Sequence, residues 1–434
     1  MLRSLRLLVM FSLLAVLFIS ARSMPELVDE HLHAGVARTE LIVPPGHKML
    51  AFPVREGGRV VDDRENEGTH DPITIRCLVL KEGDNSVALV STDFGIITES
   101  FVSKVRDLVA PQVSIPPENI IIGATHTHHG PVVERGMASE TTDEWRQYVV
   151  QSTVETIIDA ERAVIPATLG AGRGYYDLNY NRRFLRLHEK NQQIQRNLER
   201  KYYGPADKEL GVIRVDARDG RPLAVLFNYA MHPMVMGPRN RLLTADFPGA
   251  ACRTIEQSIG QQVTAIYFNG AEGNQNPYPT ELNQWDVMEE VGVELGRHVV
   301  DVYRSIETTN TSGLTVTNHR LTYKDRLQPE RELSAPFTGI FLQDASLVSV
   351  PGELFVQPGL EYKRRSPFST NFILGLTGGA IGYIPQIDAY PYGGYGVDPS
   401  SRRLGFGQVP AGFGERVWQG WLEMAYEQHD QNNR

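Results

Sequence analysis

The chain has 434 residues, of which 41% are hydrophobic, and it carries 52 Asp and Glu against 43 Lys and Arg. This acidic balance, a formal net charge of −9, argues against a nucleic-acid binder, which needs clustered positive charge to neutralise phosphates. Cys77 and Cys252 are the only cysteines, which excludes a disulfide framework and a cysteine-based zinc site and leaves open whether the two pair.

The first 23 residues have the composition of an export signal. Arg3 and Arg6 precede an apolar stretch, and small residues stand at both positions that a signal peptidase reads before the expected cleavage after Ser23. The apolar stretch is shorter than the roughly 20 residues that cross a bilayer, and no comparable run follows. We therefore expect a periplasmic or secreted protein whose mature chain, residues 24–434, has no transmembrane segment.

The mature chain opens with a predicted strand, helix and strand. Residues 72–80 and 86–92 are apolar and β-branched around a Gly-Asp-Asn turn, which predicts a hairpin. Apolar residues at helical spacing between Phe101 and Val109 predict a helix, and the apolar run from Ile120 predicts a buried strand that ends near His126.

Strands and helices continue to alternate after this point. Helical periodicity predicts a helix over about 143–164 and another around 287–302, while 223–233 and 263–270 are apolar strands. The stretch 187–209 is charged and is expected to be exposed. From residue 315 the pattern is rich in β-strands, with candidate segments at 340–354 and 371–379.

No linker, repeat or low-complexity block divides residues 24–434. The expected fold class is therefore α/β, with mixed β-sheets flanked by α-helices in a single catalytic domain. After the β-rich region comes a segment rich in Gly, Tyr and Pro, residues 382–413, with no predicted strand or helix. Because a structureless segment of that length is uncommon in a compact domain unless it is functional, we expect it to shape the active site.

A histidine pair ends the strand that begins at Ile120. Side chains two apart in a strand point to the same side, so His126 and His128 should face one site while Thr127 faces away. Such a pair is weak evidence alone, since most histidines are structural or exposed. It gains weight because α/β sheets bind ligands at the carboxyl ends of their strands.

Two further candidate ligands follow other strands. His232 ends the apolar strand 223–233, and Glu353 comes after a Pro-Gly turn that ends a buried-looking strand. A single His there is more often structural, and a Glu in such a turn is usually solvated. The case for a site rests on the convergence of these residues.

The chain resembles the catalytic domain of neutral/alkaline ceramidases from Gly35 to about Tyr395. The segments that carry this resemblance occur in the family's order and rough spacing: HDPITIRCLVL, ALVSTDFG, GATHTHHGP, NYNRR, NYAMHP, NGAEGNQNP, VPGEL and the Tyr-rich segment after GLTGG. As a set these motifs are specific, although each alone is not.

The resemblance implies a Zn²⁺ site and assigns its ligands. By position in the family motifs, the ligands would be the following four residues: His126, His232, Glu353 and Tyr383. Two imidazoles and a carboxylate suit zinc, and tyrosine is an unusual fourth ligand.

The resemblance also implies roles in catalysis. His128 matches the general base, and Arg182 with Tyr395, and with Tyr390 as a further candidate, matches the group that binds the substrate carbonyl. Such a site would use zinc-activated water, and a fixed guanidinium would stabilise the developing oxyanion. From the residues alone, Arg182 is as readily a surface arginine, and Tyr390 and Tyr395 are as readily packing aromatics.

Three features depart from the family pattern. Asn276 stands where ceramidases carry a serine that they need for activity; its amide can bind substrate but cannot act as a nucleophile. His129 replaces a small serine beside the metal. We also expect the family's C-terminal immunoglobulin-like domain to be absent, because the sequence ends at Arg434. Long-chain ceramide is therefore a doubtful substrate.

The leading hypothesis is an exported zinc amidohydrolase that acts on an N-acyl amide, either ceramide-like or smaller. The alternatives are a zinc esterase or lactonase, because the same groups would polarise an ester carbonyl, and a non-catalytic zinc- or ligand-binding protein. The partner is thus a small-molecule or lipid amide, and the sequence leaves the oligomeric state open.

A phosphoesterase is a weaker possibility, suggested by polar residues at strand ends. Asp93 follows one strand, Asn269 and Asn274 follow another, and Asp246 precedes a helix that begins near Pro248. Two-metal phosphoesterases need several convergent carboxylates, and the candidates here are Asp93, Asp246 and Glu353. For Asp93 and Asp246, capping of a strand end or of a helix is the simpler interpretation.

Overall fold

The computed structural model describes residues 31–50, 54–56, 59–61, 64–134, 141–188, 191–196, 204–398 and 407–432. The expected signal peptide at residues 1–23 lies outside these ranges. No helix in the described part of the chain is both long and apolar enough to cross a membrane.

The larger sheet has eight strands in the order β15-β13-β12-β8-β1-β5-β6-β7. The β5–β6 hairpin is antiparallel, whereas β6–β7 and β13–β15 are parallel pairs. The bounds of the strands in chain order are β1 His33–Leu41, β5 Ile73–Glu82, β6 Asn85–Thr92, β7 Ile120–Ala124, β8 Ile165–Tyr175, β12 Glu209–Ala217, β13 Pro222–Tyr229 and β15 Thr264–Asn269.

A second sheet of four strands has the order β17-β18-β19-β21. Its strands are β17 Thr315–Lys324, β18 Glu332–Phe341, β19 Ala345–Ser349 and β21 Thr370–Leu374. Short pairs complete the β-structure: β2 Val54–Glu56 with β3 Arg59–Val61, β4 Gly68–Thr69 with β14 Leu242–Leu243, β9 Asn179–Asn181 with β16 Gln275–Pro277, β10 Arg183–His188 with β11 Asn191–Arg196, and β20 Glu353–Leu354 with β22 Tyr383–Ile384.

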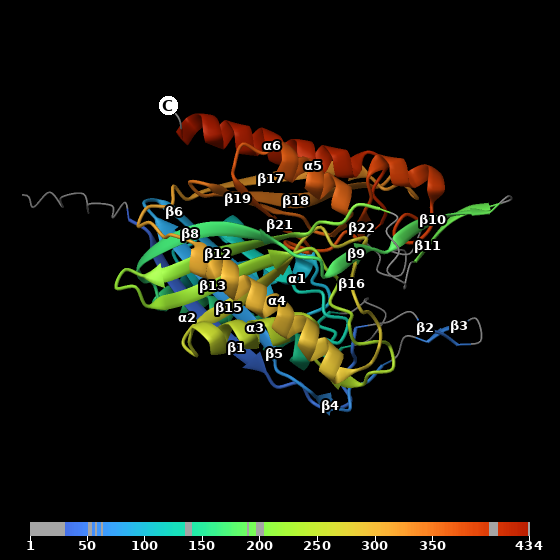
Figure 1. Ribbon diagram of the computed structural model, residues 1–434, viewed down its shortest axis with the longest axis horizontal. Coiled ribbons are helices and arrows are strands. Elements are labelled where there is room, and N and C mark those ends of the chain that lie inside the picture. Colours follow the sequence, from blue (N-terminus) through green and yellow to red (C-terminus); the bar gives the residue numbers. More distant parts are fainter. Residues whose placement is uncertain are drawn as a thin grey trace, which may run out of the picture.

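The helices lie on the outer faces of the two sheets (Figure 1). Four of them cover the larger sheet, and two cover the smaller sheet. Their bounds are α1 Glu99–Val109, α2 Asp143–Arg162, α3 Asp246–Ile259, α4 Trp285–Ser305, α5 Val356–Arg365 and α6 Phe413–Asn432.

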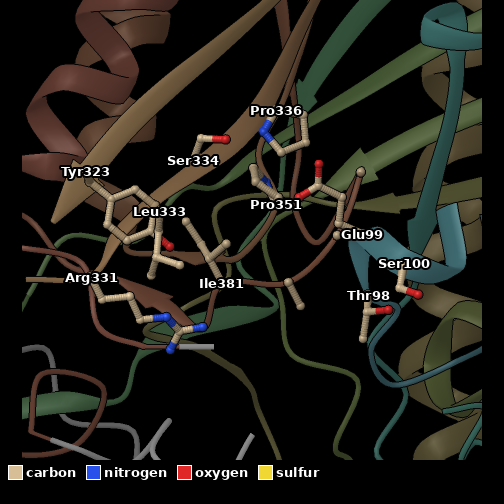
Figure 2. A pocket seen from close by; sticks show the side chains of 13 residues that line it. Thr98, Glu99, Ser100, Tyr323, Arg331, Leu333, Ser334, Pro336, Pro351 and Ile381 are labelled. Atoms are coloured by element: carbon tan, nitrogen blue, oxygen red, sulfur yellow. The ribbon is translucent and has the colours of Figure 1, made fainter. Parts of the chain in front are cut away.

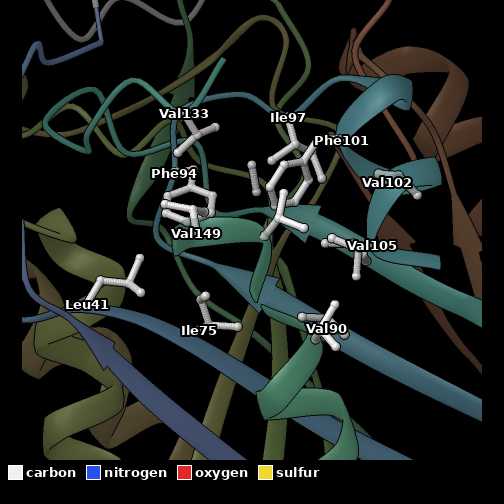
Figure 3. Packing of buried hydrophobic residues seen from close by; sticks show 14 of the residues in the cluster. Leu41, Ile75, Val90, Phe94, Ile97, Phe101, Val102, Val105, Val133 and Val149 are labelled. Atoms are coloured by element: carbon white, nitrogen blue, oxygen red, sulfur yellow. The ribbon is translucent and has the colours of Figure 1, made fainter. Parts of the chain in front are cut away.

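Successive side chains along a strand of the larger sheet point to opposite faces, so the two faces belong to two separate hydrophobic cores. In β5, Ile75 and Cys77 point toward α1 and α2, while Leu78 and Leu80 point toward the smaller sheet. Figure 3 shows the first of these cores, where Val90 and Phe94 pack with residues of the two helices. The result is four layers, helix–sheet–sheet–helix, and the expected α/β class with mixed sheets and flanking helices is confirmed.

The strands and helices predicted between residues 72 and 305 occur within a few residues of their expected bounds. The expectation of an exposed stretch at 187–209 is wrong at its carboxyl end, where Asp207 and Glu209 are buried and form ion pairs with Lys363. Cys77 and Cys252 do not pair; both are free and buried.

Candidate metal centre

His126 and His128 are placed by a turn rather than by the pleat of a strand. Strand β7 ends at Ala124, and His126 adopts a left-handed backbone with φ 71°. The ring centroids of His126 and His128 are 4.9 Å apart, and Thr127 points away to donate to the Thr244 carbonyl (2.7 Å). The two imidazoles therefore face one site as expected. The cause is the turn after β7 and not the alternation of side chains along a strand.

Backbone carbonyls fix the tautomers of two imidazoles. His126 Nδ1 donates to the Gly95 carbonyl (2.6 Å), and His232 Nδ1 donates to the carbonyls of Glu272 (2.8 Å) and Gln275 (3.1 Å). Because a carbonyl can only accept, each Nδ1 carries the proton and each Nε2 presents a lone pair. Metal-binding histidines typically donate in this way from the ring nitrogen that faces away from the metal.

Glu353 lies against both of these Nε2 atoms. Its Oε2 is 3.2 Å from His232 Nε2 and 3.6 Å from His126 Nε2. Burial would raise the pKa of the Glu353 carboxyl, but its close contacts with the imidazoles of His126 and His232 outweigh burial, so the pKa lies well below its usual value. Burial and the neighbouring guanidinium of Arg182 lower the pKa of His232 to about 3. An ionised carboxylate thus meets a neutral imidazole.

Tyr383 is brought to Glu353 by strand pairing. The short parallel pair β20–β22 places Glu353 opposite Tyr383. Burial and the Glu353 charge raise the pKa of the Tyr383 phenol well above its usual value. The phenol is therefore neutral, and it would coordinate zinc as an anion only if the cation offset both effects.

The four predicted zinc ligands converge on one buried point, and His128 joins them. Ligand atoms of His126, His128 and His232 all lie within 4.8 Å of one another. His126 Nε2 is buried without a hydrogen-bond partner among the described residues. Lone pairs and a carboxylate that face one another form an unfavourable cluster unless a cation lies between them. The donor set of imidazole nitrogen and carboxylate oxygen fits zinc.

Arg182 supplies the positive charge at this point of the structure. Its side chain is 1% exposed, and its Nη2 donates to His232 Nε2 (3.1 Å), the Gly273 carbonyl (2.7 Å) and the Tyr383 hydroxyl (3.0 Å). The alternative of a surface arginine is therefore wrong. A guanidinium this close to the cluster is placed to bind a substrate oxygen.

The two candidate tyrosines have different environments. The hydroxyl of Tyr395 is 3.1 Å from that of Tyr383, and its ring lies under the Arg182 guanidinium at 4.9 Å. The hydroxyl of Tyr390 instead donates to the carbonyls of Val409 and Pro410 (both 3.1 Å). The structure thus brings Tyr395 into the site but directs the Tyr390 hydroxyl away from it.

Asn276 lies in the site with one half of its amide engaged. Its Oδ1 accepts from Arg182 Nη1 (3.2 Å), and the side chain is fully buried. Its Nδ2 has no hydrogen-bond partner within the described ranges. Asn276 therefore orients the guanidinium and retains two N–H donors for a bound molecule.

His129 is a structural residue of the loop and does not narrow the metal site. It is fully buried, its Nε2 donates to the Gly237 carbonyl (3.1 Å), and its Nδ1 is 3.8 Å from Asp246 Oδ2. Burial lowers its pKa to about 3, with a further contribution from Arg64. The neutral ring connects the 126–130 loop to the segment that follows His232.

Two of the three candidate phosphoesterase carboxylates, Asp93 and Asp246, have structural partners away from the metal centre. Asp93 forms an ion pair with Arg76 (3.1 Å), and Asp246 accepts backbone N–H groups from Val235, Met236 and Phe247. Asp246 is the first residue of α3. Asp93 also accepts from the Thr74 N–H (3.0 Å), which agrees with capping of a strand end. The N-cap of α3 is Ala245 without a side-chain hydrogen bond, so the expectation that Asp246 precedes the helix as its N-cap is wrong.

Sequence reasoning missed two titratable residues beside the site, Glu272 and Arg183. Both carboxylate oxygens of Glu272 are buried without a hydrogen-bond partner in the described structure, and burial with the nearby Glu353 charge raises its pKa well above the usual value. Arg183 donates to the carbonyls of Gly393 (2.9 Å) and Tyr395. The adjacent Arg182-Arg183 pair was the available signal: one side chain enters the site and the other holds the Tyr-rich segment.

A cavity of about 250 Å³ lies next to the segments that carry Glu353 and Tyr383 (Figure 2). The start of α1, at Thr98 and Glu99, forms one wall, and Tyr323 and Leu333 of the smaller sheet form another. Pro351 and Ile381, each two residues from a predicted ligand, lie between these walls. None of the predicted site residues lines this cavity, so it neighbours the metal centre without containing it.

Comparisons of the sequence point to one family. Residues 58–278 match the family model described as neutral/alkaline non-lysosomal ceramidase, N-terminal. Neutral ceramidase B of Dictyostelium discoideum is 25% identical over 214 residues, which are 46% of this chain and 29% of that protein. The neutral ceramidase of Mycobacterium tuberculosis is 26% identical over 221 residues, 46% of this chain and 32% of that protein. The match thus spans about a third of these relatives.

Comparisons of the structure extend further along the chain. A crystal structure of neutral ceramidase from Pseudomonas aeruginosa superposes with a TM-score of 0.70 at 16% identity, covering 90% of this chain and 75% of that one. A ceramidase complexed with C2 gives a TM-score of 0.72 at 14% identity and covers 93% and 76%. At this identity the likeness establishes the fold.

Proposed function

The chain belongs to the neutral/alkaline ceramidase family, and from that premise we propose that it is an exported, zinc-dependent hydrolase that cleaves an N-acyl amide. One observation supports the proposal: the Nε2 atoms of His126 and His232 and the carboxylate of Glu353 face one point, and this donor set fits a zinc ion. Arg182, a group suited to binding a carbonyl oxygen, lies at the same point.

Four residues would hold the metal: His126, His232, Glu353 and Tyr383. When bound, zinc would act as a Lewis acid and lower the pKa of water at the site to about 7. This chain's own groups divide the remaining tasks. His128 accepts and returns a proton, while Arg182 and Asn276 bind the amide oxygen and the charge that develops on it.

The substrate is proposed as an N-acyl amide, without a commitment to ceramide. Asn276 lacks the hydroxyl that the corresponding serine would offer, so a mechanism that uses a serine at this position is excluded. The match also spans only about a third of the curated relatives. Export follows from the signal-like residues 1–23 and belongs to the same proposal.

Chelation and metal restoration provide the first test. Wild-type protein is stripped with a chelator and assayed on N-acyl amides of increasing chain length, on ceramide and on matched esters. We expect amide turnover to disappear and to return with zinc. Turnover of esters alone would reject the amidase and favour the esterase or lactonase alternative.

Variants of two neighbouring histidines separate binding from proton transfer. His126→Ala should lose bound zinc. His128→Ala should keep it while kcat falls by about 100- to 10,000-fold, the usual contribution of a general base. His319→Ala, at an exposed position of β17, is the matched control and should change neither property. Unchanged hydrolysis by zinc-loaded His128→Ala would show that His128 is not the general base. If neither the wild type nor any variant hydrolyses a substrate, the alternative of a non-catalytic binding protein is favoured.

A further inference from the structure

Arg64 is a buried arginine next to the loop that carries His128. Arg64 is only 4% exposed. Its backbone pairs with the segment 47–50, where the Met49 N–H donates to the Arg64 carbonyl (2.8 Å). The segment is remote in sequence from every residue assigned to the metal centre. No motif in the sequence singles it out.

The guanidinium of Arg64 ties three segments together through their carbonyl oxygens. Nη2 donates to the carbonyl of His128 (2.8 Å) and to that of Leu50, and Nη1 donates to the carbonyl of Asn240 (3.1 Å). Leu50 precedes Arg64, Asn240 lies in the loop after His232, and His128 lies in the loop after β7. The rigid planar fork of arginine can satisfy several carbonyls at once in a fixed geometry.

The His128 peptide is therefore held at both of its polar groups. The His128 N–H donates to the carbonyl of Pro233 (3.2 Å), the residue after His232, while the His128 carbonyl accepts from Arg64. The flanking residues are also bound: Thr127 Oγ1 donates to Thr244, and Thr244 N–H donates to the His129 carbonyl (3.2 Å). Of these contacts, only the one from Arg64 brings a charge to the His128 backbone.

We propose that Arg64 is a positioning residue for His128: its guanidinium fixes the backbone of the proton-transfer residue relative to His232 and so holds the imidazole at the metal centre. The inference rests on the proposed function, because it assigns Arg64 a part in catalysis through His128. A displacement of about 1 Å in a reacting group can reduce a rate by about 100-fold, so the loss of this contact should be visible in kcat.

The test compares Arg64→Gln and Arg64→Lys with a control of the same kind. Arg106 is partly buried and also donates to backbone carbonyls, those of Glu118 and Ile120, but at the opposite end of β7 from His126. Arg106→Gln removes comparable hydrogen bonds away from the site. Each protein is assayed for zinc content, for kcat and KM per zinc-loaded molecule, and for hydrogen exchange of the peptide that spans residues 126–131.

Arg64→Gln should keep zinc, lower kcat by about 10- to 100-fold with KM within about threefold, and speed exchange of the 126–131 peptide. Arg64→Lys, which keeps the charge but not the fork, should recover part of kcat, and it serves as the readout if Arg64→Gln does not fold. Arg106→Gln should leave kcat and this peptide unchanged.

Unchanged kcat and unchanged exchange in both Arg64 variants would overturn the proposal. A fall in kcat that only follows lost zinc would do the same, because it would make Arg64 a general structural residue. Failure of the proposed function is distinguishable. If His128→Ala is fully active, His128 is not the base, and the catalytic role of Arg64 is rejected. Hydrogen exchange of the 126–131 peptide would still report whether Arg64 fixes the loop.

Discussion

The two ends of the Asn276 amide have different surroundings, so the role of each end can be tested separately. The Oδ1 end accepts from Arg182, whereas the Nδ2 end is buried and faces no acceptor in the described structure. A buried donor without a partner costs roughly 1 to 3 kcal/mol, a cost that a bound substrate oxygen would remove. The two ends can be tested with two substitutions, one that removes the whole amide and one that removes only its Nδ2 donor.

We predict that Asn276→Ala lowers kcat/KM for the amide substrate by about 100-fold, the effect of removing one oxyanion donor. Asn276→Asp keeps the acceptor for Arg182 and removes the Nδ2 donor. Equal losses in both variants, measured by steady-state kinetics at equal zinc content, would assign the effect to the donor. Full activity in Asn276→Asp would show instead that Asn276 acts only by orienting Arg182.

At the level of residues, the sequence predicted the members of the site better than their geometry. His126, His232 and Glu353 were named from motif order, and the structure brings them together, although their roles remain predictions. The Tyr390 hydroxyl is directed elsewhere, because which of several tyrosines in one segment reaches the site depends on loop conformation. Arg64 could not be found from sequence, since its acceptors are backbone carbonyls that leave no residue pattern.

At the level of elements, helices α3 and α4 approach each other closely on the outer face of the larger sheet. Gly292 of α4 lies so near α3 that an added Cβ would be 2.3 Å from the Ala250 side chain and 2.7 Å from the Phe247 carbonyl. Helix α3 begins at Asp246, whose carboxylate holds the segment after His232. The packing of these two helices therefore supports one wall of the candidate site.

Gly292→Ala is predicted to destabilise the protein, because overpacking at this contact costs roughly 1 to 3 kcal/mol and exceeds the gain of up to about 1 kcal/mol from better helix propensity. Gly420→Ala in α6 is the control, since nothing lies within 4 Å of the added Cβ there and only the propensity gain remains. Urea unfolding should give opposite signs for the two substitutions. Stabilisation of both would contradict the close contact.

Periodicity predicted those elements in which apolar residues alternate regularly. Helices α2 and α4 were found in this way because one face of each is buried, whereas the β5–β6 hairpin was found from its continuous apolar runs, since both faces of its strands are buried. Strand β8 was missed because its sequence, IPATLGAGRGY, places glycine at alternate positions. The space at Gly170 and Gly172 is filled by residue Ile306, so the apolar side chains that would mark this strand are contributed by another segment.

At the level of the whole molecule, the four layers could not be predicted from the sequence. No pattern along the chain indicates which face of one sheet packs against which face of the other. The same layering buries titratable groups far from water. His129 is held neutral with a pKa of about 3, and burial raises the pKa of Asp246 to about 7. These two groups make the stability of the fold depend on pH in opposite directions.

The contribution of His129 can be isolated by substitution. Its folded-state pKa lies below the unfolded value of 6.5, so its stabilising contribution is complete above pH 6.5 and is lost as the pH falls toward 3. At about 1.4 kcal/mol per pH unit, the loss between pH 7 and pH 5 is about 2 kcal/mol. The contribution of Asp246 to stability has the opposite sign, because it is lost as the pH rises from about 4 to 7. A variant in which only His129 is replaced keeps this contribution.

We therefore predict that the stability advantage of the wild type over His129→Gln shrinks by about 2 kcal/mol between pH 7 and pH 5. Glutamine can still donate to the Gly237 carbonyl but cannot take up a proton, so the difference isolates the titration. The measurement is urea unfolding at constant ionic strength with a chelator present, so that metal binding does not contribute. His319→Gln on the exposed face of β17 should track the wild type at both pH values. A pH-independent difference between wild type and His129→Gln would mean that His129 is not buried as a neutral imidazole.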